Sequence, residues 1–173
     1  MCLFVLLATP LTLSEVRSML AAGLAAHTED SETQRLFRSR WPRFQTVVSI
    51  THGACSCDLV LPRHPVSRED EARLRTRYRA MGLARGHILA ALERHRRAAG
   101  EVPQPAGYWA RMLAEFVAEH ARNAGPSIYL LHFSPTARLA ALPHSEPITL
   151  TAGEVRSNPS GWLPEGQMVE IRS

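Results

Sequence analysis

Residues 44–61 read F-Q-T-V-V-S-I-T-H-G-A-C-S-C-D-L-V-L, and they combine a clear strand signal with two of the three cysteines of the chain. Residues 44–50 are rich in β-branched and aromatic side chains, which pack well on a pleated sheet. Residues 52–54 predict a turn, and residues 57–61 predict a short strand that stops before Pro62. Because the connection is so short, we expect the two strands to pair as a hairpin.

Towards the N-terminus, a strand and a helix are predicted. Residues 2–8, C-L-F-V-L-L-A, form an uninterrupted apolar run, which is typical of a strand buried on both faces. The sequence T-L-S-E at 12–15 is a capping-box pattern that starts a helix. One face of that helix carries Leu13, Val16, Leu20 and Leu24. Residues 27–43 are polar and predict a loop.

Towards the C-terminus, the pattern predicts helices followed by a strand. Residues 67–99 read as a long helical stretch, and two glycines predict a kink at 81–86 because glycine weakens helices. The strongest helix signal lies at 105–124 and ends at Gly125-Pro126. Its apolar stripe consists of Trp109, Met112, Leu113, Phe116, Val117 and His120. Residues 127–133 predict another strand with two apolar faces.

This order of elements predicts an α+β fold. It matches a ferredoxin-like βαββααβ sheet with helices on one face. Residues 1–134 are predicted to form this core domain. Residues 135–173 contain several prolines and are predicted to form a short β-rich tail that packs on the core or extends it.

The composition favours a globular protein in a reducing compartment. The chain has 173 residues, 45% of them hydrophobic and 21% charged, which is sufficient for one buried core. Three cysteines, two of them one residue apart, argue against a relaxed disulfide. No apolar run approaches the roughly 20 residues of a membrane span, and the first apolar run lacks the basic start of a secretion signal. We therefore expect a cytoplasmic protein without membrane contacts.

The cysteines and one histidine form the main candidate site. In a ferredoxin-like order the first and third strands are parallel neighbours, so Cys2 and Cys57, which begin them, would lie at one end of the sheet. Cys55 and His52 lie on the turn leading to that end. Three thiolates and an imidazole suit tetrahedral zinc, so these four residues are predicted to be zinc ligands. Two other interpretations are cysteines that only fill the core and thiols with a redox role.

Two resemblances concern the same cysteines. An M-C-x-F strand followed by an H-G-x-C-x-C hairpin resembles a loose group of short uncharacterised bacterial proteins, over about the first third of the chain. That resemblance implies that Cys2, His52, Cys55 and Cys57 belong together, and it implies no activity. The start M-C-L-F is also similar to class II glutamine amidotransferases, which use an N-terminal cysteine as nucleophile. Leu3 follows where that family has glycine or a basic residue, and no substrate motif of the family occurs downstream.

A second candidate site is an arginine-rich helix. Residues 67–98 hold nine arginines and four acidic residues, a net charge of +5 in a chain whose net charge is +4. Arg73, Arg75, Arg77 and Arg79 alternate, which spreads them over a wide arc of a helix. This arc suits nucleic acid or an acidic protein as partner. The competing interpretation is a solvated helix face with ion pairs at four-residue spacing.

Motifs of common enzyme classes are missing from the sequence. There is no H-x-x-x-H pair, no Walker-type loop and no G-x-S-x-G elbow. His120, on the apolar stripe of its helix, and His132, in a strand, are predicted to be core or rim histidines with internal partners. The sequence therefore favours a binding protein over an enzyme, with a thiol enzyme as an alternative.

Overall fold

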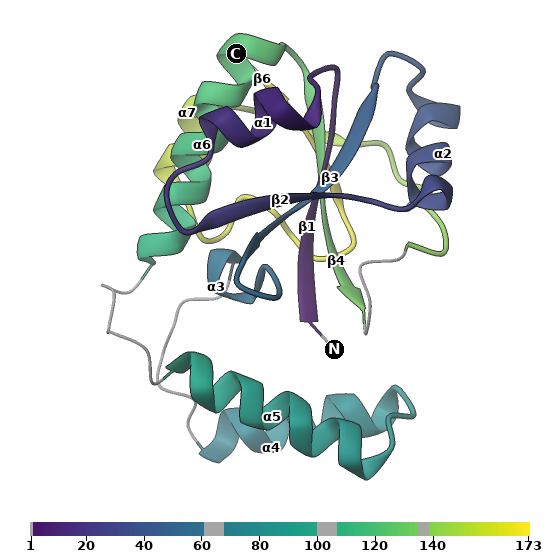
Figure 1. Ribbon diagram of the computed structural model, residues 1–173, viewed down its shortest axis with the longest axis vertical. Helices are drawn as coiled ribbons and strands as arrows, with labels where there is room; N and C mark the ends of the chain where they lie inside the picture. The colour runs from purple at the N-terminus through teal and green to yellow at the C-terminus, as the bar shows by residue number, and fades with distance from the viewer. Residues whose placement is uncertain (1, 61–67, 100–106, 135–138) are drawn as a thin grey trace.

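A six-stranded sheet in the order β2-β3-β1-β4-β6-β5 organises the protein (Figure 1). The computed structural model describes residues 2–60, 68–99, 107–134 and 139–173, with backbone only at 68–70 and 94–99. The strands are β1 (Cys2–Thr9), β2 (Leu24–Thr28), β3 (Thr46–His52), β4 (Ser127–Ser134), β5 (Ile148–Thr151) and β6 (Met168–Arg172). The helices are α1 (Leu13–Met19), α2 (Ser31–Arg40), α3 (Cys57–Val60), α4 (Arg68–Ala80), α5 (Arg85–Ala99), α6 (Tyr108–Ala124) and α7 (Ala152–Ser157). The predicted α+β class is confirmed.

The sheet order differs from the predicted ferredoxin-like order. β1 pairs antiparallel with both of its neighbours, β3 and β4, whereas the prediction required a parallel neighbour. β2 pairs antiparallel with β3 at one edge, and β5 pairs parallel with β6 at the other. The two strands of residues 135–173 thus extend the sheet, because β6 pairs with β4.

Helices cover both faces of the sheet, so the prediction of helices on one face is wrong. Val5 and Leu7 of β1 face a large core with α1, α3, α6 and α7. Leu6 and Ala8 face a second core that includes Phe37 of α2. Figure 1 shows α2 on the opposite side of the sheet from α1 and α6. The prediction that the first strand is buried on both faces is confirmed.

Segment 27–43 was predicted to be a loop and instead contains all of α2 and the end of β2. The Asp30 side chain accepts a hydrogen bond from the Thr33 N–H and caps α2. Only Thr33 and Phe37 of α2 are buried, so the helix has too few apolar residues to produce a periodic pattern.

The predicted third strand is wrong, because residues 57–60 form the short helix α3; residue 61 lies outside the described residues. The capping box of Thr12 and Glu15 is confirmed, but α1 ends at Met19 and Leu24 belongs to β2. Short apolar segments fit a strand and a buried helix equally well, so tertiary contacts decide between them.

Most of the C-terminal predictions agree with the structure. α6, β4, β5 and β6 form where the sequence predicted a helix and strands, and the predicted kink is a complete break between α4 and α5. Gly82 sits at that break with φ 74°, a left-handed conformation that glycine adopts without strain.

Helices α4 and α5 form a hairpin at the end of the sheet where β1 begins (Figure 1). Its own small core consists of Tyr78, Ile88, Ala91 and Leu92. The Tyr78 ring stacks on Phe133 of β4 with centroids 6.3 Å apart, and the Arg77 guanidinium lies 3.9 Å above the same Phe133 ring. Arg77 also donates to both carboxylate oxygens of Glu165, at 2.6 and 2.9 Å. In the described part of the hairpin, the contacts with Phe133 and the ion pair with Glu165 attach it to the rest of the fold.

Candidate metal centre

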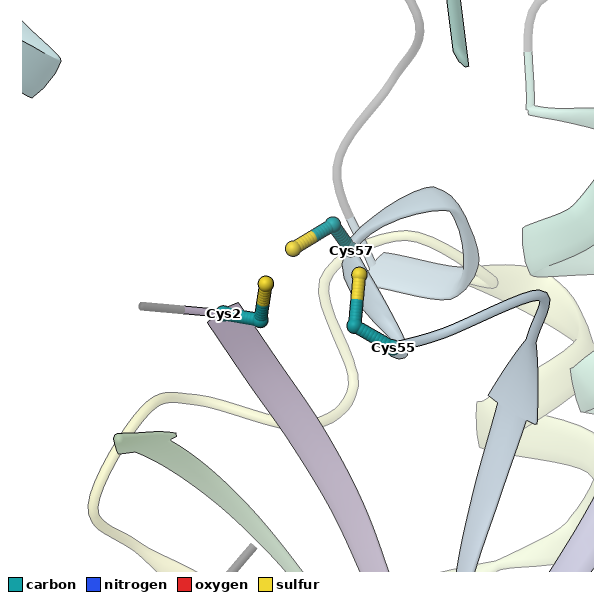
Figure 2. Close-up of side chains that lie close together, drawn as sticks. All are labelled: Cys2, Cys55 and Cys57. Atoms are coloured by element: carbon teal, nitrogen blue, oxygen red, sulfur yellow. The ribbon is translucent and has the colours of Figure 1, made fainter. Parts of the chain in front are cut away.

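Three cysteines converge where β1 begins. The Sγ atoms of Cys2, Cys55 and Cys57 all lie within 4.8 Å of one another. Figure 2 shows the three sulfurs gathered between the start of β1, the turn after β3 and the start of α3. Cys57 is buried, and the other two are partly buried. We call these three side chains the thiol cluster.

The antiparallel pairing of β1 with β3 brings the three residues together. The register pairs Val5 with Ile50, so the end of β3 lies beside the start of β1. A tight turn then reverses the chain, and the His52 N–H donates to the Cys55 carbonyl at 3.0 Å. Gly53 in this turn has φ 65°, which favours glycine. The cysteines therefore meet through a pairing different from the parallel one that was predicted.

Ser56, between the two neighbouring cysteines, ties this turn to β1. Its N–H donates to the Leu3 carbonyl at 2.8 Å, and its Oγ accepts from the Val5 N–H at 2.8 Å. The same hydroxyl donates to the Ile50 carbonyl, and Ser56 is completely buried. The Leu3 N–H in turn donates to Cys57 Sγ at 3.3 Å. The sequence analysis missed Ser56, although the central residue of a C-x-C motif is the one placed to anchor the backbone between the thiols.

His52, the fourth predicted ligand, lies outside the thiol cluster. Its Nδ1 is 2.9 Å from Asp58 Oδ2, and both side chains are 18% exposed. Its ring stacks on the Trp109 indole in the first turn of α6, with centroids 3.9 Å apart. The imidazole is therefore held by α3 and α6, and the sequence offered no signal that Asp58 and Trp109 would be its neighbours.

The thiols influence one another electrostatically. Hydrogen bonding with Cys2 is the largest cause that raises the pKa of Cys55, and burial raises it further. The pKa of Cys57 is raised well above its usual range by hydrogen bonds with Cys2 and Cys55 and by burial. Several thiolates at this spacing repel one another, which opposes ionisation of the cluster when no cation is bound. A bound cation offsets this repulsion and allows the thiols to ionise.

The opposite end of β1 holds a different polar group, which we call the histidine network. His120 of α6 has Nε2 3.0 Å from Thr9 Oγ1 and Nδ1 3.2 Å from the Tyr129 hydroxyl. Thr9 Oγ1 also accepts from the Leu11 N–H at 3.1 Å. Burial lowers the pKa of His120 to about 4 and raises that of Tyr129. The prediction of a core histidine with internal partners is confirmed for His120, and His132 is half-buried in β4.

The four alternating arginines differ in their surroundings. Arg73 and Arg79 are exposed and Arg75 is half-buried, whereas Arg77 is engaged by Phe133 and Glu165. The side chains of Arg68, Arg94, Arg96 and Arg97 lie outside the described residues. Of these four, Arg77 contacts β4 and Glu165, and Arg73 and Arg79 present exposed charges.

No protein-family model matches the chain, and neither a curated protein nor a solved structure is similar to it at a significant level. Among the described residues, no helix has the length and apolar character needed to cross a bilayer. The chemistry of the thiol cluster is the feature that bears most directly on function.

Proposed function

We propose that the protein binds a thiophilic metal ion through the thiol cluster, and that Zn²⁺ is one such ion. The observation that carries this proposal is the convergence of three Sγ atoms within 4.8 Å. A Zn–S bond of about 2.3 Å corresponds to about 3.8 Å between two sulfurs of a tetrahedral site, so shifts of about 1 Å bring the cluster to that geometry. Side-chain rotations supply shifts of this size without moving β1.

The surroundings of the cluster favour an ordered site. The hydrogen bonds of Ser56 fix the backbone between Cys55 and Cys57 against β1, and Cys57 Sγ already accepts from the Leu3 N–H. Ligands held in place lose less conformational entropy when a metal binds. Hydrogen bonds to sulfur also stabilise the thiolate form that binds the metal.

Three protein thiolates leave the fourth tetrahedral position of zinc to an exogenous ligand. Structural zinc sites are normally closed by four protein ligands, whereas open sites exchange ligands. Because His52 is not among the donors that converge within 4.8 Å, the cluster resembles the open type. An open position is compatible with metal transfer or with a metal-bound water.

Elemental analysis combined with thiol titration tests the proposal. The reduced full chain, purified without a metal-affinity column, should bind about one Zn²⁺ and then protect three thiols from alkylation. Cys57→Ser should lose this binding, whereas His52→Asn, which retains the three thiols, should keep it. Three thiols that remain fully reactive with excess Zn²⁺ would contradict the proposal. A disulfide involving Cys2 under mild oxidation, without metal binding, would instead indicate thiol redox chemistry.

A second candidate function is an interaction through the α4–α5 hairpin. The hairpin exposes Arg73 and Arg79, and it also exposes Met81 (41%) and Leu89 (51%). Exposed arginine beside exposed apolar side chains suits an acidic protein or nucleic acid. Binding to a generic duplex DNA or RNA should then weaken with salt and with the double change Arg73→Gln and Arg79→Gln. Binding that does not respond to salt would exclude the electrostatic contact.

A further inference from the structure

The number of donors in the thiol cluster limits which ions it can satisfy. Among the described histidine, cysteine, aspartate and glutamate residues, the group has three members, and all three are thiols. His52 is not in this group, because neither of its ring nitrogens lies within 4.8 Å of all three sulfurs. A four-coordinate ion must therefore take a ligand from solvent, whereas a three-coordinate one is satisfied by the protein alone.

The net charge of the bound complex also favours a three-coordinate, trivalent centre over a divalent ion. Three thiolates with a divalent ion carry a net charge of −1, and three thiolates with a trivalent centre are neutral. The cluster is partly buried, with Cys57 only 8% exposed. Burying net charge is unfavourable unless it is compensated, so the neutral complex is the more stable one in this position.

From these two observations we infer that the thiol cluster binds a trivalent metalloid, arsenic(III) or antimony(III), and retains it more tightly than Zn²⁺. This inference rests on the proposed metal-binding function and names its ligand class. In the reaction As(OH)₃ + 3 RSH → As(SR)₃ + 3 H₂O, three As–O bonds break and three As–S bonds form. Each thiol proton leaves in a water molecule, so no oxidant or reductant takes part.

The geometry suits a pyramidal trivalent centre. Such a centre holds three ligands on one side and a lone pair on the other, so it needs donors that converge from one side. The sulfurs come from two separate segments, β1 and the turn leading into α3, and Figure 2 shows them gathered in one place. Ser56 joins the turn to β1 through its bonds to Leu3 and Val5, so the third thiol reaches the centre without a large rearrangement.

The test uses the reduced, metal-free full chain with equimolar arsenite, alone and in competition with Zn²⁺. Acid protonates zinc thiolates and releases the metal, whereas covalent As–S bonds persist in acid. Intact-mass spectrometry in acid should show a gain of one arsenic and a loss of three hydrogens. The same adduct should form when equimolar Zn²⁺ is added first.

Matched variants identify the donors. Cys2→Ser, Cys55→Ser and Cys57→Ser each leave two thiols, so the adduct should lose fewer hydrogens and affinity should fall by about 100-fold or more, because the third bond is intramolecular. If Cys57→Ser does not fold because Cys57 is buried, Cys2→Ser provides the two-thiol variant for this comparison. His52→Asn should leave the arsenic adduct intact.

The outcomes separate this inference from the proposed function. If Zn²⁺ binds and arsenite forms only two-thiol adducts or is displaced by equimolar Zn²⁺, the metalloid inference is wrong and the metal-binding function stands. If neither ligand protects the thiols, both fail. A His52→Asn variant that loses zinc would identify His52 as a fourth zinc ligand and contradict the inference, because the protein alone would then satisfy a four-coordinate ion.

Discussion

The two ends of strand β1 make opposite use of buried polar groups. At Thr9, the histidine network contains matched donors and acceptors, with Thr9 and His120 fully buried. At Cys2, three thiols converge, and the pKa values of Cys55 and Cys57 are raised, mainly by hydrogen bonding with Cys2. The groups of the histidine network satisfy one another's hydrogen bonds, whereas the three thiols of the cluster are suited to bind a positively charged centre.

This difference separates a structural polar cluster from a ligand site. Buried polar groups that satisfy one another stabilise the fold and leave nothing for a ligand to contact. Three thiols brought together by the backbone destabilise the fold only slightly, because a protonated thiol behaves as a small hydrophobic group. A metal ion that binds them would add its binding free energy to the stability of the fold. The comparison therefore assigns a structural role to the network and supports the proposed binding role of the cluster.

The largest effect is expected from His120→Ala. The change leaves a cavity in the core and removes a partner from both Thr9 and Tyr129, which together should lower the free energy of unfolding by about 4 kcal/mol. Urea unfolding followed by tryptophan fluorescence measures the loss. His120→Gln, which keeps a polar group, should lose less. If the folded His120→Ala variant, measured without urea, also binds less zinc per chain, the two ends of β1 are not independent.

Addition of zinc should act through the thiol end. At a free Zn²⁺ concentration of 100 times Kd, the expected gain in unfolding free energy is about 3 kcal/mol. Chelation should reverse the gain, and Cys57→Ser should show none, whereas His120→Gln should show all of it. Equal stabilisation of Cys57→Ser by zinc would place the metal elsewhere.

Lowering the pH should reduce the stability of the fold through the histidine network. The pKa of His120 is lowered to about 4, so the folded state favours the neutral ring. Its contribution is complete above the unfolded pKa of about 6.5 and is lost as the pH falls from about 6.5 to about 4, a loss of about 3 kcal/mol. Unfolding free energies measured across this range should fall more steeply for the native chain than for His120→Gln. Parallel pH profiles of the two proteins would contradict the assignment.

Ser56→Ala is expected to have an intermediate effect on stability and a specific effect on the cluster. The change leaves the buried Val5 N–H without the hydroxyl that accepts its hydrogen bond, so we expect a loss of about 2 kcal/mol and weaker zinc binding. Ser18→Ala, whose hydroxyl bonds to Glu15 at an exposed position, is the matched control and should change neither property. Unchanged zinc affinity in Ser56→Ala would mean that the serine only supports the fold.

The smallest effect is expected from Arg77→Ala. Both partners of the Arg77–Glu165 ion pair are nearly half exposed, so the loss in stability should be at most about 1 kcal/mol. The change should mainly increase hydrogen exchange in α4 and leave both ends of β1 unchanged. A loss of zinc affinity would indicate that the docked hairpin supports the thiol end.

The local sequence patterns predicted many of the elements but not their arrangement. Apolar periodicity over α6 and apolar runs at β1 and β4 are strong signals, and these elements form where expected. The Thr12–Glu15 capping box depends on neighbouring residues alone and is also present. The polar helix α2 and the short helix α3 were missed because their type is decided by distant contacts, such as those of Phe37 and Leu59 with the cores.

The candidate site shows the same division. Residue types and the C-x-C spacing drew attention to Cys55 and Cys57, and the position of Cys2 at the start of a buried strand suggested the third thiol. The bonds of Ser56 to β1, and the stacking of His52 on Trp109, involve residues far apart in the chain. No spacing rule describes such contacts.

The sequence by itself determined the α+β class, the main helices and strands and the residues that carry thiol chemistry, because these follow from local propensity and side-chain type. The tertiary structure decided the strand order, the second helical layer and the membership of the cluster. Those features depend on which strands pair across long stretches of chain, and the antiparallel β1–β3 register is what brings three thiols, without the histidine, to one point.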